Sequence, residues 1–283
     1  MVRRAVLSLP EVQSFIDVPS NYLCSGDIHP HPGPSASESL NLKQKISISS
    51  SSLAKSTVNY SKSKSHVAIA HLNVRSLICR ENVYLVCGTV RNYDYDIFTI
   101  SETWLNPSTS DADIDIPGYI FLRKDRGERK PGGGVVYVKN TYKATLLKDL
   151  SSVSESFFQQ LWIKVQCKKL KSFILFTACR PPSTPVNFLE CLNINVMDSL
   201  LPGLDVILLG DLNCNLLGSC SDDQALLDFC ATTNLEQLVK DPTRITETSP
   251  SLIDVALTTN ENIIYNCKDM SSSISDFDDK VRA

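Results

Sequence analysis

A short apolar run followed by two polar residues is the part of this sequence best suited to chemistry. Residues 205–210 read Asp-Val-Ile-Leu-Leu-Gly, and Asp211 and Asn213 follow with one residue between them. Consecutive apolar residues before a glycine are typical of a strand that is buried on both faces. Because side chains alternate along a strand, Asp211 and Asn213 are expected to point to the same side. A carboxylate and an amide there suit a metal ion and an anionic substrate; the ordinary alternative is a turn closed by an Asx hydrogen bond.

Other polar residues also accompany apolar runs. Asn73 and Glu102 each close such a run, and Asp254 lies within the run 252–257. A charge inside an apolar run must be paired or hydrogen-bonded, so Asp254 either belongs to a site or caps backbone amides. Glu102 is likewise either a ligand or a surface loop residue. Oxygen donors of this kind suit Mg²⁺, which takes one or two carboxylates together with water and phosphate oxygens.

The alternation of apolar runs and turns predicts the elements that position these residues. Strands are expected at 67–74, 95–102, 118–124, 132–140, 157–166, 172–180, 205–210, 252–259 and 263–270, and helices at 81–93, 186–200 and 222–233. Strands mixed with a few helices indicate two packed sheets with helices outside. The expected fold is therefore an α/β (α+β) four-layer sandwich of two mixed β-sheets flanked by helices.

The first 65 residues differ in composition from the rest. Residues 35–65 contain twelve serines, one aromatic residue and no periodic apolar pattern, which indicates a disordered linker. The preceding segment, Gly26–Pro34, is dense in proline and cannot be helical. We therefore expect a disordered leader and Ser-rich linker over 1–65 and a single domain over 66–283.

Charge and cysteine content restrict the class of protein. The chain carries −3, and because residues 1–65 hold seven Lys/Arg and four Asp/Glu, residues 66–283 carry 21 − 27 = −6. This is a poor field for a nucleic-acid binder unless a divalent cation offsets part of it. The ten cysteines include no C-x-x-C pair, and no apolar run is long enough to span a bilayer. We expect an intracellular monomer, in the nucleus or cytoplasm, with reduced core thiols and no disulfide or membrane partner.

Eight short motifs occur in a fixed order along the chain. They are HLNVRSL (71–77), SETWL (101–105), RKDRGERKPGGGVVYVK (123–139), CRPPS (179–183), LLGDLN (208–213), DPTRIT (241–246), SLIDVALT (251–258) and SISD (273–276). In this order they resemble the endonuclease domain of LINE-type (non-LTR) retrotransposons, which precedes a reverse transcriptase. Those domains belong to the endonuclease/exonuclease/phosphatase family, typified by apurinic/apyrimidinic endonucleases. The resemblance covers about residues 66–277 and implies DNA nicking that depends on Mg²⁺ or Mn²⁺.

The resemblance also implies a role for each matching residue. Glu102 and Asn73 would hold the metal, with Asp276 as a further acidic residue on the metal side. Asp211 would generate or orient the attacking hydroxide, and Asn213 would contact the scissile phosphate. Asp254 would orient a catalytic histidine. DNA contacts would come from Arg75, Arg180, Thr243 and Arg244, and the basic cluster Arg123, Lys124, Arg126, Arg129 and Lys130 would be either a phosphate contact or a solvated hairpin turn.

Two residues of the family pattern are replaced in this chain. The final S-D-H motif reads Ser275-Asp276-Phe277, and Cys179 stands in place of the tyrosine of Y-R-P-P. Losing a general acid or base costs about 10²–10⁴ in rate, and no other histidine is well placed to substitute. We therefore expect a weak or inactive nuclease, with two alternatives: a non-catalytic pseudo-nuclease that keeps residual metal or DNA binding, and a phosphatase of the same superfamily.

Two further expectations concern the ends of the resemblance. Only six residues follow Phe277, so the last strand of the family's domain is expected to be truncated, which would leave an uncovered sheet edge. The Gly26–Pro34 segment resembles the ribosome-skipping leader that ends D-I-E-x-N-P-G-P. His29 and His31 replace the Glu and Asn of that pattern.

Overall fold

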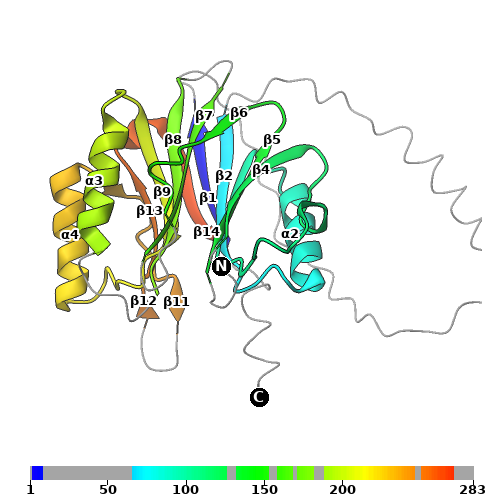
Figure 1. Ribbon diagram of the computed structural model, residues 1–283. Coiled ribbons are helices and arrows are strands. Elements are labelled where there is room, and N and C mark those ends of the chain that lie inside the picture. Colours follow the sequence, from blue (N-terminus) through cyan, green and yellow to red (C-terminus); the bar gives the residue numbers. More distant parts are fainter. Residues whose placement is uncertain are drawn as a thin grey trace, which may run out of the picture. The chain divides into compact units, whose positions relative to one another are not determined.

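The structure is a computed structural model that describes residues 2–8, 66–125, 132–152, 158–167, 171–181, 188–245 and 250–270. These residues form two six-stranded sheets that pack face to face, together with a separate pair of short strands (Figure 1). Helices cover the outer face of each sheet. The four-layer sandwich of two mixed sheets predicted from the sequence is therefore confirmed.

The first sheet has the strand order β14-β1-β2-β3-β5-β4. Its strands are β1 (Val2–Ser8), β2 (His66–Asn73), β3 (Ile97–Ser101), β4 (Tyr119–Lys124), β5 (Gly134–Lys139) and β14 (Ile264–Met270). β2 and β3 run parallel, and the other neighbours run antiparallel. The helix α2 (Arg80–Asn92) makes the crossover that a parallel pair requires, and the short helix η1 (Asp111–Asp113) precedes β4.

The second sheet has the order β10-β13-β9-β8-β7-β6. Its strands are β6 (Lys143–Leu146), β7 (Gln159–Gln166), β8 (Phe173–Cys179), β9 (Asp205–Asp211), β10 (Glu236–Gln237) and β13 (Asp254–Thr258). β8 and β9 are parallel and are connected through α3 (Phe188–Leu200), and α4 (Ser221–Thr233) follows β9. The remaining elements are β11 (Arg244–Ile245), β12 (Pro250–Ser251) and the short helix η2 (Glu261–Ile263).

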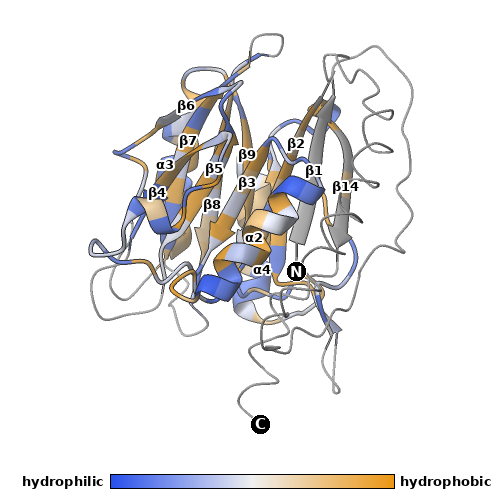
Figure 2. Cartoon of the chain, turned by 90° about the vertical axis from the view of Figure 1, so that its right-hand side faces the viewer, coloured by the Kyte–Doolittle hydropathy of each residue, from blue (hydrophilic) through white to orange (hydrophobic). Residues whose placement is uncertain are grey.

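Three apolar layers hold the sandwich together, and each sheet supplies alternate residues to two of them. Along β2, Ala68 and Leu72 pack toward α2, whereas Ile69 packs against the second sheet. Along β9, Leu208 packs toward α3 and α4, whereas Leu209 enters the layer between the sheets. Strands that are buried on both faces need apolar residues on both, which explains the continuous apolar runs of the sequence and the apolar strands in Figure 2.

The strand β1 contradicts one prediction. Val2–Ser8 was expected to be disordered as part of the leader 1–65, but it pairs antiparallel with β2 on one side and with β14 on the other (Figure 1). It belongs to the same compact unit as the described residues from His66 onward. The prediction is therefore wrong for these seven residues. The rest of the predicted linker, including Gly26–Pro34, and the predicted truncation after Phe277 lie outside the described residues.

The cysteines are also less uniform than expected. Nine are described, and all nine are free thiols. Cys179, Cys214 and Cys230 are buried as predicted, but Cys79, Cys191 and Cys220 are exposed. The interpretation of the cysteines as core residues is therefore wrong for these last three. Within the described residues, no helix is long and apolar enough to cross a membrane.

Candidate active site

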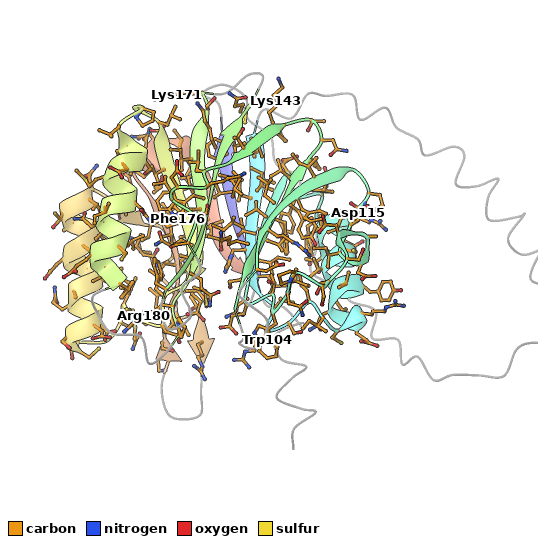
Figure 3. The ribbon with its side chains drawn as sticks, in the orientation of Figure 1. Trp104, Asp115, Lys143, Lys171, Phe176 and Arg180 are labelled. Atoms are coloured by element: carbon orange, nitrogen blue, oxygen red, sulfur yellow. The ribbon has the colours of Figure 1, made fainter. Side chains whose placement is uncertain are left out.

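The polar residues that end the predicted strands meet at one end of the sandwich. β2 ends at Asn73, β3 ends directly before Glu102, and β9 ends at Asp211. Figure 3 shows that Trp104 and Arg180, which follow β3 and β8, lie at this same end, whereas Lys143 and Lys171 lie at the opposite end. The site thus lies at the ends of strands from both sheets, and the burial of these strands fixes the positions of its residues.

Asn73 connects the carboxylates of the two sheets. Its Nδ2 lies 3.3 Å from Glu102 Oε1 in its own sheet and 3.3 Å from Asp211 Oδ2 in the other. Its Oδ1 is buried and has no hydrogen-bond partner within the described part of the chain. One amide therefore holds two carboxylates together and leaves an oxygen atom that a cation or an added donor could satisfy.

Negative charge accumulates around Asp211. The register of β9 and β13 places Asp254 directly opposite Asp211, and the Asp211 side chain is buried. Burial, followed by the charges of Asp254 and Glu102, raises the pKa of Asp211 from its ordinary 3.8 to about 7. Hydrogen bonds from the backbone of Asn213 and the side chain of Asn73 oppose this rise in pKa. A cation bound nearby would offset this negative charge and favour the ionised form of Asp211.

Asn213 lies beyond the end of the strand, so strand alternation does not place it. β9 ends at Asp211, and Asn213 adopts a left-handed φ of 48°. Its backbone N–H donates to Asp211 Oδ1 (3.0 Å), and its Nδ2 donates to the carbonyl oxygen of Arg180 (2.7 Å). The expectation based on a continuous extended strand is wrong, and the Asx hydrogen bond given as its alternative is present. This bond fixes the orientation of the Asp211 carboxylate.

The loop that carries Glu102 is held in an uncommon backbone conformation. Glu102 and Trp104 both have left-handed φ values, 54° and 55°. Such conformations cost about 1–3 kcal/mol each and persist only where the surroundings impose them. Here the Trp104 N–H donates to the carbonyl of Gly132 (2.7 Å), and the Leu77 N–H donates to the carbonyl of Thr103 (2.7 Å). Glu102 is thus a half-buried, positioned side chain and not a free surface residue.

The residue that replaces the family tyrosine also touches Glu102. Cys179 is buried at the end of β8, beside Asp211 of β9, and its Sγ lies 3.6 Å from Glu102 Oε1. Burial, followed by the charges of Glu102 and Asp211, raises the pKa of the Cys179 thiol well above its usual range. The thiol therefore stays neutral and donates weakly, and it is much shorter than a phenol.

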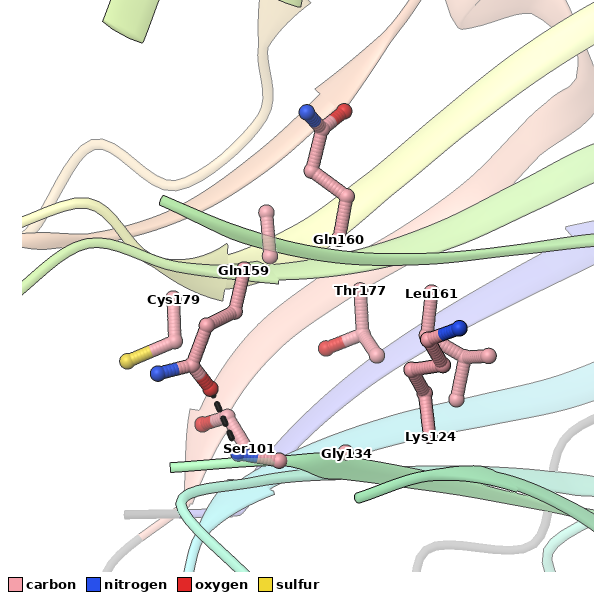
Figure 4. A pocket seen from close by; sticks show the side chains of 10 residues that line it. Ser101, Lys124, Gly134, Gln159, Gln160, Leu161, Thr177 and Cys179 are labelled. Carbon is pink, nitrogen blue, oxygen red and sulfur yellow. Dashed lines mark hydrogen bonds between the residues drawn. The ribbon is translucent and has the colours of Figure 1, made fainter. Parts of the chain in front are cut away.

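Behind Cys179 a small pocket lies between the two sheets (Figure 4). Gln159 Oε1 accepts the backbone N–H of Gly133 there, at 2.6 Å. Gln159 and Gln160 are both buried polar residues, which sequence reasoning did not assign to the site. The signal was present, because two adjacent glutamines interrupt an otherwise apolar strand and a buried amide needs a partner. The lining residues are Ser101, Lys124, Gly133, Gly134, Gln159, Gln160, Leu161, Thr177, Ala178 and Cys179.

Two residues that were predicted to contact DNA are buried and bind other parts of the protein. Thr243 is 4% exposed, and its Oγ1 accepts the backbone N–H groups of Ile253 and Asp254, both at 3.2 Å. Arg180 is 2% exposed, forms an ion pair with Asp222 and donates to the Cys214 thiol. Both predictions are therefore corrected: Thr243 holds the start of β13, and Arg180 holds α4 against the end of β8.

The remaining predicted site residues are at least partly exposed, lie outside the described residues, or form ion pairs within the fold. Arg244 is exposed on β11, and Arg75 has a left-handed φ of 51° just after β2, so contact with DNA stays a prediction for both. Asp276 and Phe277 lie outside the described residues. Arg123 of the predicted basic cluster forms ion pairs with Asp111 and Asp125, which accounts for its charge within the fold.

The donor set of the site suits a hard cation. Among the described residues, no three His, Cys, Asp or Glu side chains lie close enough together to enclose a metal ion. Mg²⁺ does not require such a cage, because it keeps several waters and takes one or two carboxylates. The Glu102 carboxylate and the unpartnered Asn73 Oδ1 are oxygen donors of this kind. The residues present therefore fit Mg²⁺, with the remaining ligands supplied by water and substrate.

A sequence profile of the endonuclease/exonuclease/phosphatase family matches residues 71–264. The match spans the described site from Asn73 to Asp254. The chain belongs to this family. No curated protein sequence matches it.

Solved structures of this family share the fold. The endonuclease domain of TRAS1, a telomere-specific non-LTR retrotransposon, is 12% identical with a TM-score of 0.51, over 70% of this chain and 92% of that one. The catalytic domain of Xenopus laevis APE2 is 17% identical with a TM-score of 0.53, over 69% of this chain and 83% of that one. Identities this low establish the fold alone. The resemblance of this endonuclease/exonuclease/phosphatase domain to retrotransposon and apurinic/apyrimidinic endonucleases, predicted from the motifs, is confirmed at that level.

Proposed function

We propose that this chain is a divalent-cation-dependent phosphodiesterase that nicks DNA with low turnover. The observation that carries the proposal is the Asn73 amide, which joins Glu102 of one sheet to Asp211 of the other. Hydrolysis of a phosphodiester builds negative charge on the phosphate oxygens, so it needs a cation site beside a proton acceptor. Glu102 and Asn73 form the cation side of this site, and Asp211 forms the acceptor side.

The role of Asp211 follows from its surroundings. The N–H of Asn213 holds its Oδ1, and its Oδ2 faces Asn73. With a pKa of about 7, the carboxylate can accept a proton from an attacking water at Oδ2 near neutral pH. When bound at Glu102 and Asn73 Oδ1, Mg²⁺ would neutralise charge on a phosphate oxygen.

Low turnover follows from the two replaced residues. The Cys179 thiol donates to Glu102 and is held neutral, so it does not supply the hydrogen bond of a phenol to a phosphate. Phe277 replaces the histidine of the family motif and has no proton to exchange. The loss of one general acid or base lowers the rate by about 10²–10⁴.

DNA is favoured over a small phosphoester as substrate by two observations. The motifs S-E-T-W, R-P-P-S and T-R-I-T are of the retrotransposon type. TRAS1, which shares the fold, is named as a retrotransposon endonuclease. Because residues 66–283 carry −6, we expect weak DNA binding that falls further as salt is added.

A plasmid-nicking assay tests this function. Supercoiled plasmid and Mg²⁺ are incubated with wild type, with Glu102→Gln, and with the double variant Cys179→Tyr/Phe277→His. We expect slow nicking by wild type, none by Glu102→Gln, and nicking at least about tenfold faster by the double variant, which regains an imidazole and a phenol. Glu190→Gln, on the exposed face of α3, is the matched control and should nick as wild type does.

The other outcomes separate the alternatives. Equal nicking by wild type and Glu102→Gln would contradict the proposed site. Intact plasmid with wild type and with the double variant, together with a melting temperature that still rises with Mg²⁺, would establish a pseudo-nuclease. Intact plasmid with release of phosphate from a small phosphomonoester would establish a phosphatase.

A further inference from the structure

The strand β1 has an unusual place in the first sheet. It lies between β2 and β14, and residues 9–65 separate it from β2 along the chain. At about 3.3 Å per residue, these 57 intervening residues could span up to roughly 190 Å. Chain connectivity alone therefore does not fix the position of Val2–Ser8.

Pairing with both neighbours accounts for its position. With β2 the register is continuous and antiparallel, from Val2 opposite Leu72 to Ser8 opposite His66. With β14 it is also antiparallel, with one irregularity between Val6 and Leu7. Both edges of β1 are thus occupied along most of its length. Without β1, β2 and β14 would each present a row of unpaired backbone N–H and C=O groups.

The slot that β1 fills has the width of one strand. Neighbouring strands lie roughly 4.8 Å apart, so β2 and β14, each paired with β1, are separated by roughly 10 Å. Only an extended segment can pair with both edges at once. Recognition of this kind depends chiefly on backbone hydrogen bonds, as in other proteins that add a strand to a sheet.

We propose that the first sheet carries a strand-docking site between β2 and β14, and that its occupant is the chain's own segment Val2–Ser8. The site takes an extended segment of seven residues, antiparallel to both neighbours. The segment is held by this pairing and not by its covalent connection to β2, so it stays bound when that connection is cut.

Docking also bears on the active site. Val2 lies opposite Leu72, and Leu72 directly precedes Asn73, whose amide joins Glu102 to Asp211. With β1 docked, β2 is paired on both sides near this end; without it, only β3 supports β2. We expect release of β1 to loosen Asn73 and weaken cation binding. This consequence, unlike the docking itself, rests on the proposed function.

A cleavage experiment on the full chain tests the docking site. A protease recognition sequence is inserted between Ser50 and Ser51, and the folded protein is cut and passed over a size-exclusion column. The fragment that contains β1 is expected to co-elute with the larger fragment. An excess of a synthetic peptide of residues 1–10 should displace it, and a scrambled peptide should not.

A proline variant adds a second arm. Ala5→Pro removes a backbone N–H from the middle of β1 and should cause release on cutting, whereas Ser37→Pro, in the same fragment but outside the strand, should not. Immediate separation of the wild-type fragments would overturn the proposal. Retention of the Ala5→Pro fragment, or failure of the 1–10 peptide to displace wild type, would overturn it as well, since the fragment would then be held elsewhere.

The proposed function is read out separately in the same samples. The rise in melting temperature with Mg²⁺ is measured before cutting and after displacement of β1, and it should be smaller after displacement. If Mg²⁺ has no effect at either stage while the fragment is retained and displaced as expected, the cation site fails and the docking site stands.

Discussion

The side-chain amide of Asn73, at the end of β2, lies 3.3 Å from a carboxylate oxygen of Asp211, at the end of β9 in the opposite sheet. The two residues are 138 positions apart in the sequence. Their contact exists only because the layer of apolar residues between the sheets aligns the two strand ends. The same alignment brings Glu102 and Asp254 toward Asp211, so negative charge gathers around a buried carboxylate.

Removing the Asp211 charge is expected to stabilise the fold at neutral pH. The pKa of Asp211 is about 7 in the folded protein and near 3.8 in the unfolded chain. The folded state therefore binds this proton more tightly, and the resulting stabilisation is complete below about pH 4 and is lost as the pH rises to about 7. Asp211→Asn does not titrate. Its advantage over wild type in the free energy of unfolding should grow by up to about 1.4 kcal/mol per pH unit over this window and level off above it.

Urea unfolding at several pH values measures this difference. Asp228→Asn, exposed on α4, is the matched control and should differ little from wild type at any pH. An Asp211→Asn variant that is less stable than wild type at pH 8 would contradict the charge accumulation. Asp211→Asn is also expected to abolish nicking, because it removes the proton acceptor.

Binding of Mg²⁺ is expected to raise the melting temperature more at pH 8 than at pH 6. A bound cation and a proton compete for the same negative charge, and Asp211 loses its proton near pH 7. Thermal melts with and without Mg²⁺ at both pH values check this dependence. Glu102→Gln should remove the shift. An equal shift at both pH values would mean that the cation binds away from Asp211.

Gly210→Ala is expected to disrupt the second sheet severely. A Cβ atom at this position would lie 2.0 Å from the carbonyl oxygen of Ala178 on the neighbouring strand β8. The backbone of Ala178 cannot move aside as a flexible side chain can. We therefore expect the free energy of unfolding to fall by about 3 kcal/mol or more, or the variant to fail to fold. Gly88→Ala on α2, where nothing lies within 4 Å, should instead stabilise the protein by about 1 kcal/mol. Chemical denaturation of the two variants measures both effects.

Thr243→Val is expected to loosen the start of β13. The variant keeps the shape of the side chain but removes the oxygen that accepts the N–H groups of Ile253 and Asp254. Leaving buried donors unsatisfied costs about 1–3 kcal/mol, and amide exchange at Asp254 should become faster. Thr243→Ser keeps the hydroxyl and should retain most of the protection. Unchanged exchange in Thr243→Val would show that the hydroxyl does not hold this strand.

Substitution of Arg180 is expected to lower stability, whereas substitution of Arg244 is expected to weaken DNA binding. Arg180→Ala removes the ion-pair partner of the partly exposed Asp222 and a donor to Cys214, and should cost about 1–3 kcal/mol of stability. Arg244→Ala, at an exposed position, should leave stability unchanged but weaken DNA binding and reduce its dependence on salt. Melts and salt titrations of DNA affinity measure the two properties. Equal loss of DNA affinity in a folded Arg180→Ala protein would restore the original prediction for Arg180.

Local pattern was sufficient for most of the fold. Apolar runs such as 205–210, and the periodic segments that became α2 and α4, predicted their elements within one or two residues, because burial on one or both faces leaves a direct trace in the sequence. The resemblance of the ordered motifs to the endonuclease family placed Asn73, Glu102 and Asp211 in one site, although they come from two different sheets.

Distant contacts decided the rest. The composition of Val2–Ser8 does not reveal that this segment pairs with β2 and β14. The pairing depends on the edges of these two strands, and at least 57 residues separate each of them from β1 along the chain. Thr243 and Arg180 look like surface contacts in their motifs, but the packing of β13 and α4 places their polar atoms inside the protein. The sequence by itself therefore determined the family, the layers and the chemical types of the site residues. Only the tertiary structure decided which of those side chains face the site, because that depends on how buried polar groups find partners across the fold.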